Sequence, residues 1–211
     1  MDMDERGTAP ETEDEEAPLT AGQFFMEMVK VFLLAAAIII PVRVFLFQPF
    51  FVQGSSMVPN FEDGEYLVVN EFGFKWTDVG VPGMHLFTVS PWKELERQTP
   101  IVFKSPVTDG QFLIKRVIGL PGESVEIKNS KVIITNGTFP DGFTLDESDY
   151  LAKTVFTSDM PKQRLADDEY FVLGDNRTAS YDSRMIGPIR KDLIVGRVLF
   201  RAWPIGRVTG Y

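Results

Sequence analysis

A long apolar segment near the N-terminus constrains this chain more than any other feature of its sequence. Residues 24–47 read FFMEMVKVFLLAAAIIIPVRVFLF, and the 12 residues Val31–Val42 carry no charged side chain. A spanning helix needs roughly 17–25 residues. Extending the helix toward the N-terminus adds only Glu27 and Lys30, which lie three positions apart and can pair on a helix. We therefore predict one membrane-spanning helix over residues 23–47.

A cleaved export signal and a buried core helix are the alternatives to an anchor. The segment before the apolar run is acidic rather than basic, and Ala35–Ala37 lies inside the run, which disfavours a cleaved signal. An apolar run without a polar face is uncommon in a small soluble domain. An uncleaved anchor is therefore favoured. Few charges flank it, and the positive-inside rule leans only weakly toward a cytoplasmic N-terminus.

The net charge of −9 is concentrated in the first 22 residues, which hold eight acidic residues and one basic residue. This leader, residues 1–22, has too few large apolar side chains to offset the entropy of ordering, so we predict that it is disordered. An acidic leader can bind a basic partner, although a solvated leader is the favoured interpretation. The remainder of the chain is nearly neutral. The negative balance argues against nucleic acid as the partner.

The rest of the chain, residues 48–211, has the pattern of a β-rich domain. Short β-branched and aromatic runs alternate with turn residues, and no long amphipathic helix competes with them. The predicted strands are Glu65–Asn70, Ile101–Lys104, Gln111–Leu120, Val125–Lys128, Lys131–Thr135, Tyr170–Leu173 and Leu193–Trp203. Residues 73–98 and 138–168 are polar or broken by Gly and Pro, and are interpreted as excursions. The fold class is mainly β: a twisted antiparallel sheet or barrel-like domain after one N-terminal transmembrane helix.

The shortage of cysteine and histidine limits the chemistry available to this domain. With no Cys and a single His, His85, thiolate nucleophiles, Cys-ligated zinc and multi-His metal sites are excluded. Serine needs a base to remove its proton. Where that base is not His, the usual substitute is a lysine whose pKa is lowered by burial in an apolar pocket.

Three polar elements are candidates for a site. Ser55 and Ser56 follow the apolar segment FLFQPFFVQ in a Gly/Pro turn, within GSSMVP. Lys115 lies on the predicted strand QFLIKRVIGL, whose two faces are both largely apolar, so its ammonium would be desolvated. The loop GDNRTASYDSR, residues 174–184, concentrates Asp, Asn, Ser and Arg directly after a predicted strand. Taken singly, each element also fits a purely structural role.

Taken in order, these elements resemble the bacterial type I signal peptidases, which are membrane-anchored Ser-Lys endopeptidases. The resemblance covers roughly residues 24–204 and rests on S-M-x-P after an anchor, K-R-V-x-G-x-P-G, G-D-N-(x)3-S-x-D-S-R and a terminal G-R-(x)6-W-P. It implies Ser56 as nucleophile, Lys115 as general base and Ser180 as the residue that orients the lysine. It further implies ion pairs that brace the site, at Asp175, Asp182, Arg184 and Arg116. Apolar pocket positions would be Phe50, Val52, Met57, Leu113 and Ile114.

Two positions depart from the family pattern near the serine. Gly54 stands where some relatives have a Ser that completes the oxyanion hole, so the hole here is expected to use backbone N–H groups, including that of Ser56. Asn60 replaces the common Thr after S-M-x-P, and Thr99-Pro100 replaces the usual Gly-Asp before the strand that begins at Ile101. These differences affect turns rather than the Ser-Lys pair.

The resemblance implies acyl transfer from preproteins that carry small residues at −1 and −3, bound as an added strand. It requires neither a metal nor a cofactor. The expected partners are signal peptides, the lipid bilayer and the secretion translocon, with the anchor in the inner or plasma membrane, the N-terminus cytoplasmic and the catalytic domain extracytoplasmic. The apolar segment before Ser56 would let the active site rest on the membrane.

Other interpretations remain open at this point. Ser90 and Lys93 match S-x-x-K, but the partner motifs of penicillin-binding enzymes are absent. A triad built on His85 is weak, because His85 lies in a Gly/Pro-broken segment and is expected to be an ordinary loop residue. A non-catalytic membrane-anchored β-domain that binds peptides is the non-enzyme alternative. A Ser-Lys processing peptidase with narrower substrates is the nearest enzyme alternative.

Overall fold

The computed structural model describes residues 20–41, 46–81 and 83–211. The predicted disorder of the acidic leader therefore lies outside the described residues, apart from its last few positions. The chain divides into two units, one ending at Ile40 and one running from Pro41 to Tyr211. We describe each unit by itself.

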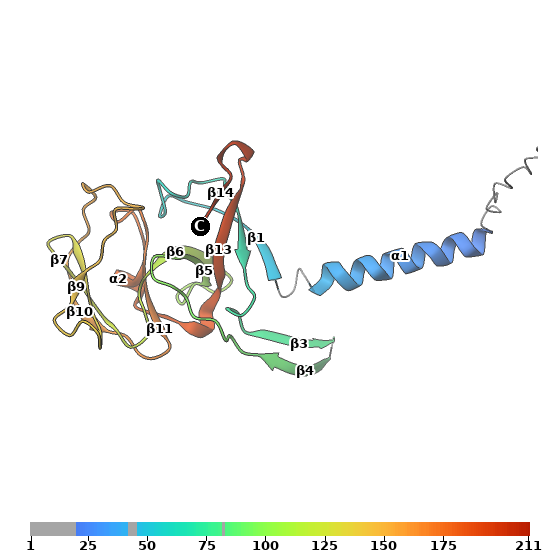
Figure 1. Cartoon of the computed structure of the whole chain (residues 1–211), viewed down its shortest axis with the longest axis horizontal. Coiled ribbons are helices and arrows are strands. Elements are labelled where there is room, and N and C mark those ends of the chain that lie inside the picture. Colours follow the sequence, from blue (N-terminus) through green and yellow to red (C-terminus); the bar gives the residue numbers. More distant parts are fainter. Residues whose placement is uncertain (1–19, 42–45, 82) are drawn as a thin grey trace, which may run out of the picture. The chain divides into compact units, whose positions relative to one another are not determined.

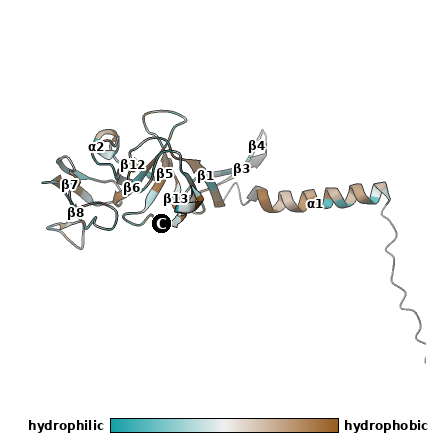
Figure 2. Cartoon of the chain, turned by 90° about the horizontal axis from the view of Figure 1, so that it is seen from above, coloured by the Kyte–Doolittle hydropathy of each residue, from teal (hydrophilic) through white to brown (hydrophobic). Residues whose placement is uncertain are grey.

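The first unit contains the helix α1 (Ala21–Pro41). A capping box starts it: Thr20 N donates to Gln23 Oε1 (2.9 Å), and Gln23 N donates to Thr20 Oγ1 (3.4 Å). The expected pair also forms, with Lys30 Nζ 2.8 Å from Glu27 Oε1. At about 1.5 Å per residue the helix is roughly 30 Å long, the thickness of a bilayer core. It is long and apolar enough to span a membrane, and Figure 2 shows the hydrophobic colouring over most of it.

The second unit is built on one large antiparallel sheet (Figure 1). In sheet order its strands are β1 (Phe47–Phe51), β2 (Tyr66–Asn70), β13 (Ile194–Trp203), β5 (Pro100–Lys104), β6 (Phe112–Gly119), β11 (Glu169–Leu173) and β12 (Ile189–Arg190), and β14 (Thr209–Gly210) pairs with β13. Gly196 allows β13 and β2 to approach closely, because a Cβ there would lie 2.1 Å from Asn70 O. The long strand β13, which contains bulges, pairs with β2 on one side and with β5 on the other, so it joins β1 and β2 to the remaining strands of the sheet.

Two smaller sheets complete the unit. The strands β10 (Met160–Arg164), β7 (Ser124–Lys128), β8 (Lys131–Thr135) and β9 (Phe143–Thr144) form a four-stranded antiparallel sheet. The strands β3 (Thr77–Val81) and β4 (Met84–Val89) form a separate hairpin that projects from the large sheet in Figure 1. The short helices are α2 (Ser183–Ile186), η2 (Lys191–Leu193) and η3 (Ile205–Arg207).

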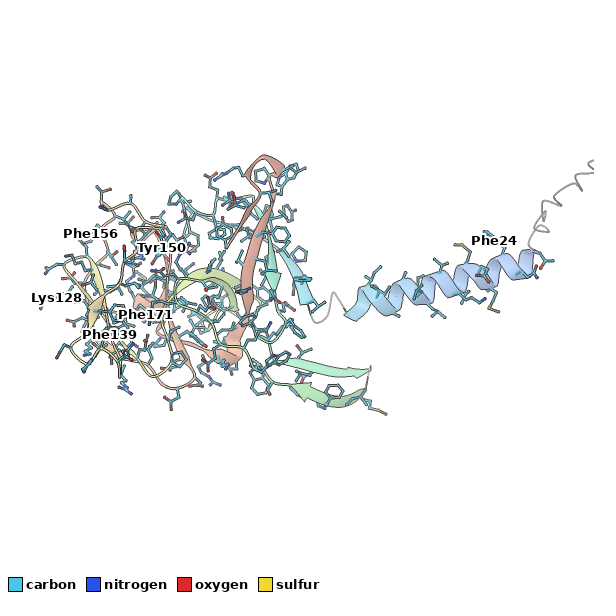
Figure 3. The ribbon with its side chains drawn as sticks, viewed as in Figure 1. Phe24, Lys128, Phe139, Tyr150, Phe156 and Phe171 are labelled. Carbon is cyan, nitrogen blue, oxygen red and sulfur yellow. The ribbon has the colours of Figure 1, made fainter. Side chains whose placement is uncertain are left out.

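The apolar faces of these sheets bury three clusters of side chains. One cluster contains Phe103, Val117 and Tyr170 from β5, β6 and β11. A second lies between the large sheet and the four-stranded sheet and includes Phe171, which is labelled in Figure 3. A third, around Phe61, fills the space under β1, β2 and β13. Burial of this apolar surface is what stabilises the arrangement.

The predicted mainly β, antiparallel fold is confirmed, and each of the seven predicted strands is present with its ends moved by no more than one residue. The structure adds strands where the sequence was interpreted differently. β1 begins at Phe47, inside the predicted anchor segment, and α1 ends at Pro41 as described. The two predicted excursions contain the β3–β4 hairpin and the strands β9 and β10. His85 therefore lies on a strand, not in a loop.

Candidate active site

Ser56 lies in the turn between β1 and β2. Two backbone hydrogen bonds join the start and the end of this connection: Val52 N donates to Glu65 O (2.8 Å), and Gly64 N donates to Val52 O (3.0 Å). The next residue, Met57, is 1% exposed and belongs to the cluster around Phe61. Because Met57 is buried, the turn is fixed on the core while Ser56 itself stays half-buried.

Lys115 faces Ser56 from the middle of β6. Its Nζ lies 2.7 Å from Ser56 Oγ and 2.8 Å from Ile114 O, and the whole residue is only 2% exposed. Burial lowers the pKa of Lys115 from 10.5 to about 8, and the carboxylates of Asp182 and Asp175 oppose this shift in part. A substantial fraction of Lys115 is therefore neutral in mildly alkaline solution.

A cavity of about 360 Å³ opens beside this pair. Of the pocket positions expected from the sequence, Phe50, Val52, Leu113 and Ile114 line it. Met57 does not line it, because its side chain turns inward to the core, so its expected place in the pocket is wrong. The remaining lining residues are Phe51, Gln53, Ser56, Leu67, Val102, Gly110, Gln111, Phe112 and Lys115. The cavity wall thus combines apolar side chains with polar groups, among them the Ser-Lys pair.

The two expected ion pairs, Arg116–Asp175 and Arg184–Asp182, are both formed. Arg116, which follows Lys115, donates from Nε to Asp175 Oδ1 (2.8 Å) and from Nη2 to Asp175 Oδ2 (2.6 Å). Arg184 Nη2 lies 2.8 Å from Asp182 Oδ2. Asp175 and Asp182 are at most 1% exposed. Such bidentate pairs fix the planes of both groups, so the pairs hold the loop 174–184 in one conformation.

Ser180 is buried in the same loop, but the structure gives its hydroxyl no hydrogen-bond partner. Its expected role of orienting the lysine is not reproduced as a hydrogen bond, since the Lys115 ammonium bonds to Ser56 and Ile114 instead. Gly174 packs directly against it: a Cβ at Gly174 would lie 2.1 Å from Ser180 Oγ and 2.5 Å from Ser56 O. The glycine therefore lets the loop approach the turn that carries Ser56.

Several residues that hold the site were not singled out by the sequence analysis. Asn176 N donates to Ser56 O (3.0 Å), and its Nδ2 donates to Ser55 O (3.1 Å). Arg177 is 3% exposed and pairs with Glu147 (2.5 Å). Asn176 and Arg177 both lie inside the motif that begins Gly-Asp-Asn, so the density of polar residues there was the available signal. Glu147 lies far away in the sequence, and no local pattern marked it.

The other sequence candidates are not brought to this site. His85 contacts Thr88 and Asp78 on the β3–β4 hairpin, where its Nε2 lies 3.4 Å from Asp78 Oδ1. Lys93 Nζ lies 4.9 Å from the centroid of the Phe72 ring, and no hydrogen bond joins it to the exposed Ser90. Within the described residues no cluster of His, Asp and Glu could hold a metal ion.

A β-rich domain that holds a serine hydroxyl against a buried lysine, beside a cavity partly lined by apolar side chains, has the geometry of a Ser-Lys hydrolase. Residues 25–203 match the family described as "Signal peptidase, peptidase S26". The chain is 34% identical to Signal peptidase IB of Staphylococcus aureus over 190 residues, which cover 85% of this chain and 90% of the relative. The chain belongs to the S26 family of signal peptidases and is thus a serine endopeptidase.

One further curated relative agrees with this assignment. Signal peptidase I of Leptolyngbya laminosa is 28% identical over 183 residues, covering 87% of this chain and 82% of the relative. Among solved structures, a signal peptidase I from Enterococcus faecalis is 32% identical and covers 50% of this chain and 97% of its own, with a TM-score of 0.41.

Proposed function

We propose that this signal peptidase cleaves its preproteins through an acyl-enzyme, with Ser56 as nucleophile and Lys115 as general base. Family membership supports the removal of signal peptides as the overall reaction. The single observation that supports the residue assignment is the 2.7 Å contact between Ser56 Oγ and a lysine that is 2% exposed. A neutral lysine at that distance can accept the hydroxyl proton.

The steps follow from this geometry. Neutral Lys115 takes the proton of Ser56, and Ser56 Oγ attacks the scissile carbonyl carbon to form a tetrahedral oxyanion. The Ser56 N–H makes no hydrogen bond among the described residues and is available to donate to that oxyanion. Protonated Lys115 then gives its proton to the leaving amine. A water, deprotonated by Lys115, hydrolyses the ester and releases the signal peptide.

Open strand edges support binding of the substrate in extended form. β1 pairs with β2 on one side and has no described strand on the other. β11 pairs with β6 only from Arg116 onward, so the stretch of β6 before that residue has β5 on one side and no described strand on the other. The cavity lies between these two free edges. A peptide added there would bond to backbone groups on both sides and direct alternate side chains into the cavity.

We expect the cleavage rate to follow the deprotonation of Lys115. Below a pH of about 8 the value of kcat/KM should rise roughly tenfold per pH unit, and it should level off above that pH, because only the neutral amine accepts the proton. Cleavage of a detergent-solubilised model preprotein between pH 5 and pH 10 measures this, with circular dichroism at each pH as a control for unfolding. Full activity near pH 5 would point to carboxylate chemistry instead.

The apolar side chains that line part of the cavity predict which residue the substrate can carry at −1. We expect substitution of −1 Ala by Asp to lower kcat/KM at least about 100-fold, because the carboxylate would be buried without its water shell and would also favour protonated Lys115. Substitution by Ser, which is equally small but uncharged, should cost less than about tenfold. Matched preproteins that differ only at this position provide the measurement. Equal cleavage of the Asp and Ser substrates would contradict the proposed pocket.

We also propose that α1 anchors the enzyme with its N-terminus in the cytoplasm and the β domain on the opposite side. The apolar length of α1 supports anchoring. Lys30 lies near the middle of α1, so the orientation rests on the expectation that signal peptides are cut after they cross the membrane. The lipid bilayer and the secretion translocon are then the neighbours of this enzyme in the cell.

A further inference from the structure

Asn60 joins two parts of the site that are far apart in the sequence. It lies four residues after Ser56, at the end of the same turn. Its Nδ2 donates to Asp175 Oδ2 (2.8 Å) and to Tyr150 O (2.8 Å). Its carbonyl oxygen accepts a hydrogen bond from Arg201 Nη2. Hydrogen bonds therefore fix both the side chain and the backbone of Asn60.

The carboxylate that Asn60 reaches belongs to the lysine side of the site. Asp175 is 1% exposed and is bound by Nε and Nη2 of Arg116, the residue after Lys115 on β6. The ring of Tyr150 covers that guanidinium, with 4.1 Å from the carbon Cζ to the ring centroid. Tyr150, labelled in Figure 3, comes from the segment between β9 and β10. A short chain of contacts thus leads from the turn to the strand that carries the lysine.

The turn is fastened to the loop 174–184 at two points. At the first, Asn176 binds the carbonyl groups of Ser55 and Ser56. At the second, Asn60 binds Asp175. Of the residues between these points, Met57 is buried in the core. With both ends fixed on adjacent residues, the turn has little freedom to move Ser56 away from Lys115.

We propose that Asn60 is a positioning residue for catalysis. Its hydrogen bond to Asp175 fixes the end of the turn that carries Ser56 and thereby keeps Ser56 Oγ within hydrogen-bond distance of Lys115 Nζ. The inference rests on the proposed roles of Ser56 and Lys115. Proton transfer needs a contact near 2.7 Å, and a displacement of the order of 1 Å can cost about 100-fold in rate. Asn60 does not line the cavity beside Ser56 and Lys115, so its loss should affect the chemical step far more than substrate binding.

The test is Asn60→Leu, which keeps the branched shape and removes the donor. We expect kcat to fall about 10- to 100-fold while KM changes less than about threefold. Asn136→Leu is the matched control, because Asn136 Nδ2 donates to Glu123 Oε1 (2.9 Å), and Glu123 pairs with Arg97 (2.7 Å). The control loses a similar amide–carboxylate bond away from Ser56. It should lower the melting temperature and leave kcat unchanged.

A second pair of variants separates the hydrogen bond from side-chain shape. Asn60→Thr offers a hydroxyl donor and should keep kcat within about threefold of wild type. Asn60→Val has the shape of Asn60→Thr without the donor and should behave like Asn60→Leu. This pair decides the matter should Asn60→Leu fail to fold. Wild-type kcat in Asn60→Val, or an equal loss of kcat in Asn136→Leu, would overturn the inference. Ser56→Ala in the same assay tests the proposed function separately: if it is inactive while Asn60→Val is fully active, only the role of Asn60 is wrong.

Discussion

Replacing Ser56 by alanine should abolish preprotein cleavage, with a loss of at least about 10⁴-fold in kcat, while Ser55→Ala should retain most of the activity. The reason is that only the Ser56 hydroxyl lies 2.7 Å from the lysine. Ser55 is exposed, and its hydroxyl makes no hydrogen bond among the described residues. Removal of a nucleophile leaves no group to form the acyl-enzyme, and comparable deletions cost several orders of magnitude.

The measurement is single-turnover cleavage of a purified preprotein by the full-length enzyme in detergent or vesicles. Ser55→Ala serves as the matched control, because it removes a hydroxyl from the same turn and leaves the Asn176 contact to the Ser55 carbonyl in place. Melting temperatures within a few degrees of wild type would exclude unfolding as the cause. Substantial cleavage by Ser56→Ala would refute the nucleophile assignment and favour the non-catalytic or carboxylate-based alternatives.

The sequence predicted those parts of this molecule that depend on local pattern. Short β-branched and aromatic runs bounded by turn residues located five strands of the large sheet (β2, β5, β6, β11 and β13), because such side chains fit a pleated, buried surface. The low number of Cys and His pointed to a serine with a lysine base, and the order of the motifs pointed to the family. The structure then placed Ser56 and Lys115, which are 59 residues apart, in contact.

The features that the sequence did not predict depend on contacts between distant segments or on competing patterns. β1 was not predicted as a strand, because its first residue, Phe47, continues the apolar run of the anchor, although the structure pairs Phe47–Phe51 with β2. The bond from Asn60 to Asp175 spans 115 residues, and nothing in either local pattern requires it. The family resemblance placed Met57 in the pocket, yet the direction of a turn residue is set by the core that it packs on.

Lys115→Met should give the second large effect, a loss of activity comparable to that of Ser56→Ala together with a gain in stability. Activity is lost because methionine cannot accept a proton. Stability is gained because the wild-type protein buries a group that prefers to be charged in water. The lowered pKa, about 8 in the folded state against 10.5 for a free lysine, corresponds to roughly 3 kcal/mol of destabilisation below pH 8. Loss of the two Nζ hydrogen bonds offsets part of the gain, about 1 kcal/mol for each.

The dependence of this gain on pH distinguishes it from simple repacking. Below pH 8 the lysine is protonated in both states, and the folded state bears the full cost of the buried charge. Between pH 8 and 10.5 the folded state has released its proton while the unfolded state has not, so wild-type stability rises with pH relative to Lys115→Met. Melting temperatures of both proteins from pH 6 to pH 11 should therefore converge as the pH rises. A constant difference in melting temperature across this range would show that the pKa of Lys115 is not lowered in the folded state. Burial would then not explain how Lys115 could act as a neutral base near pH 8.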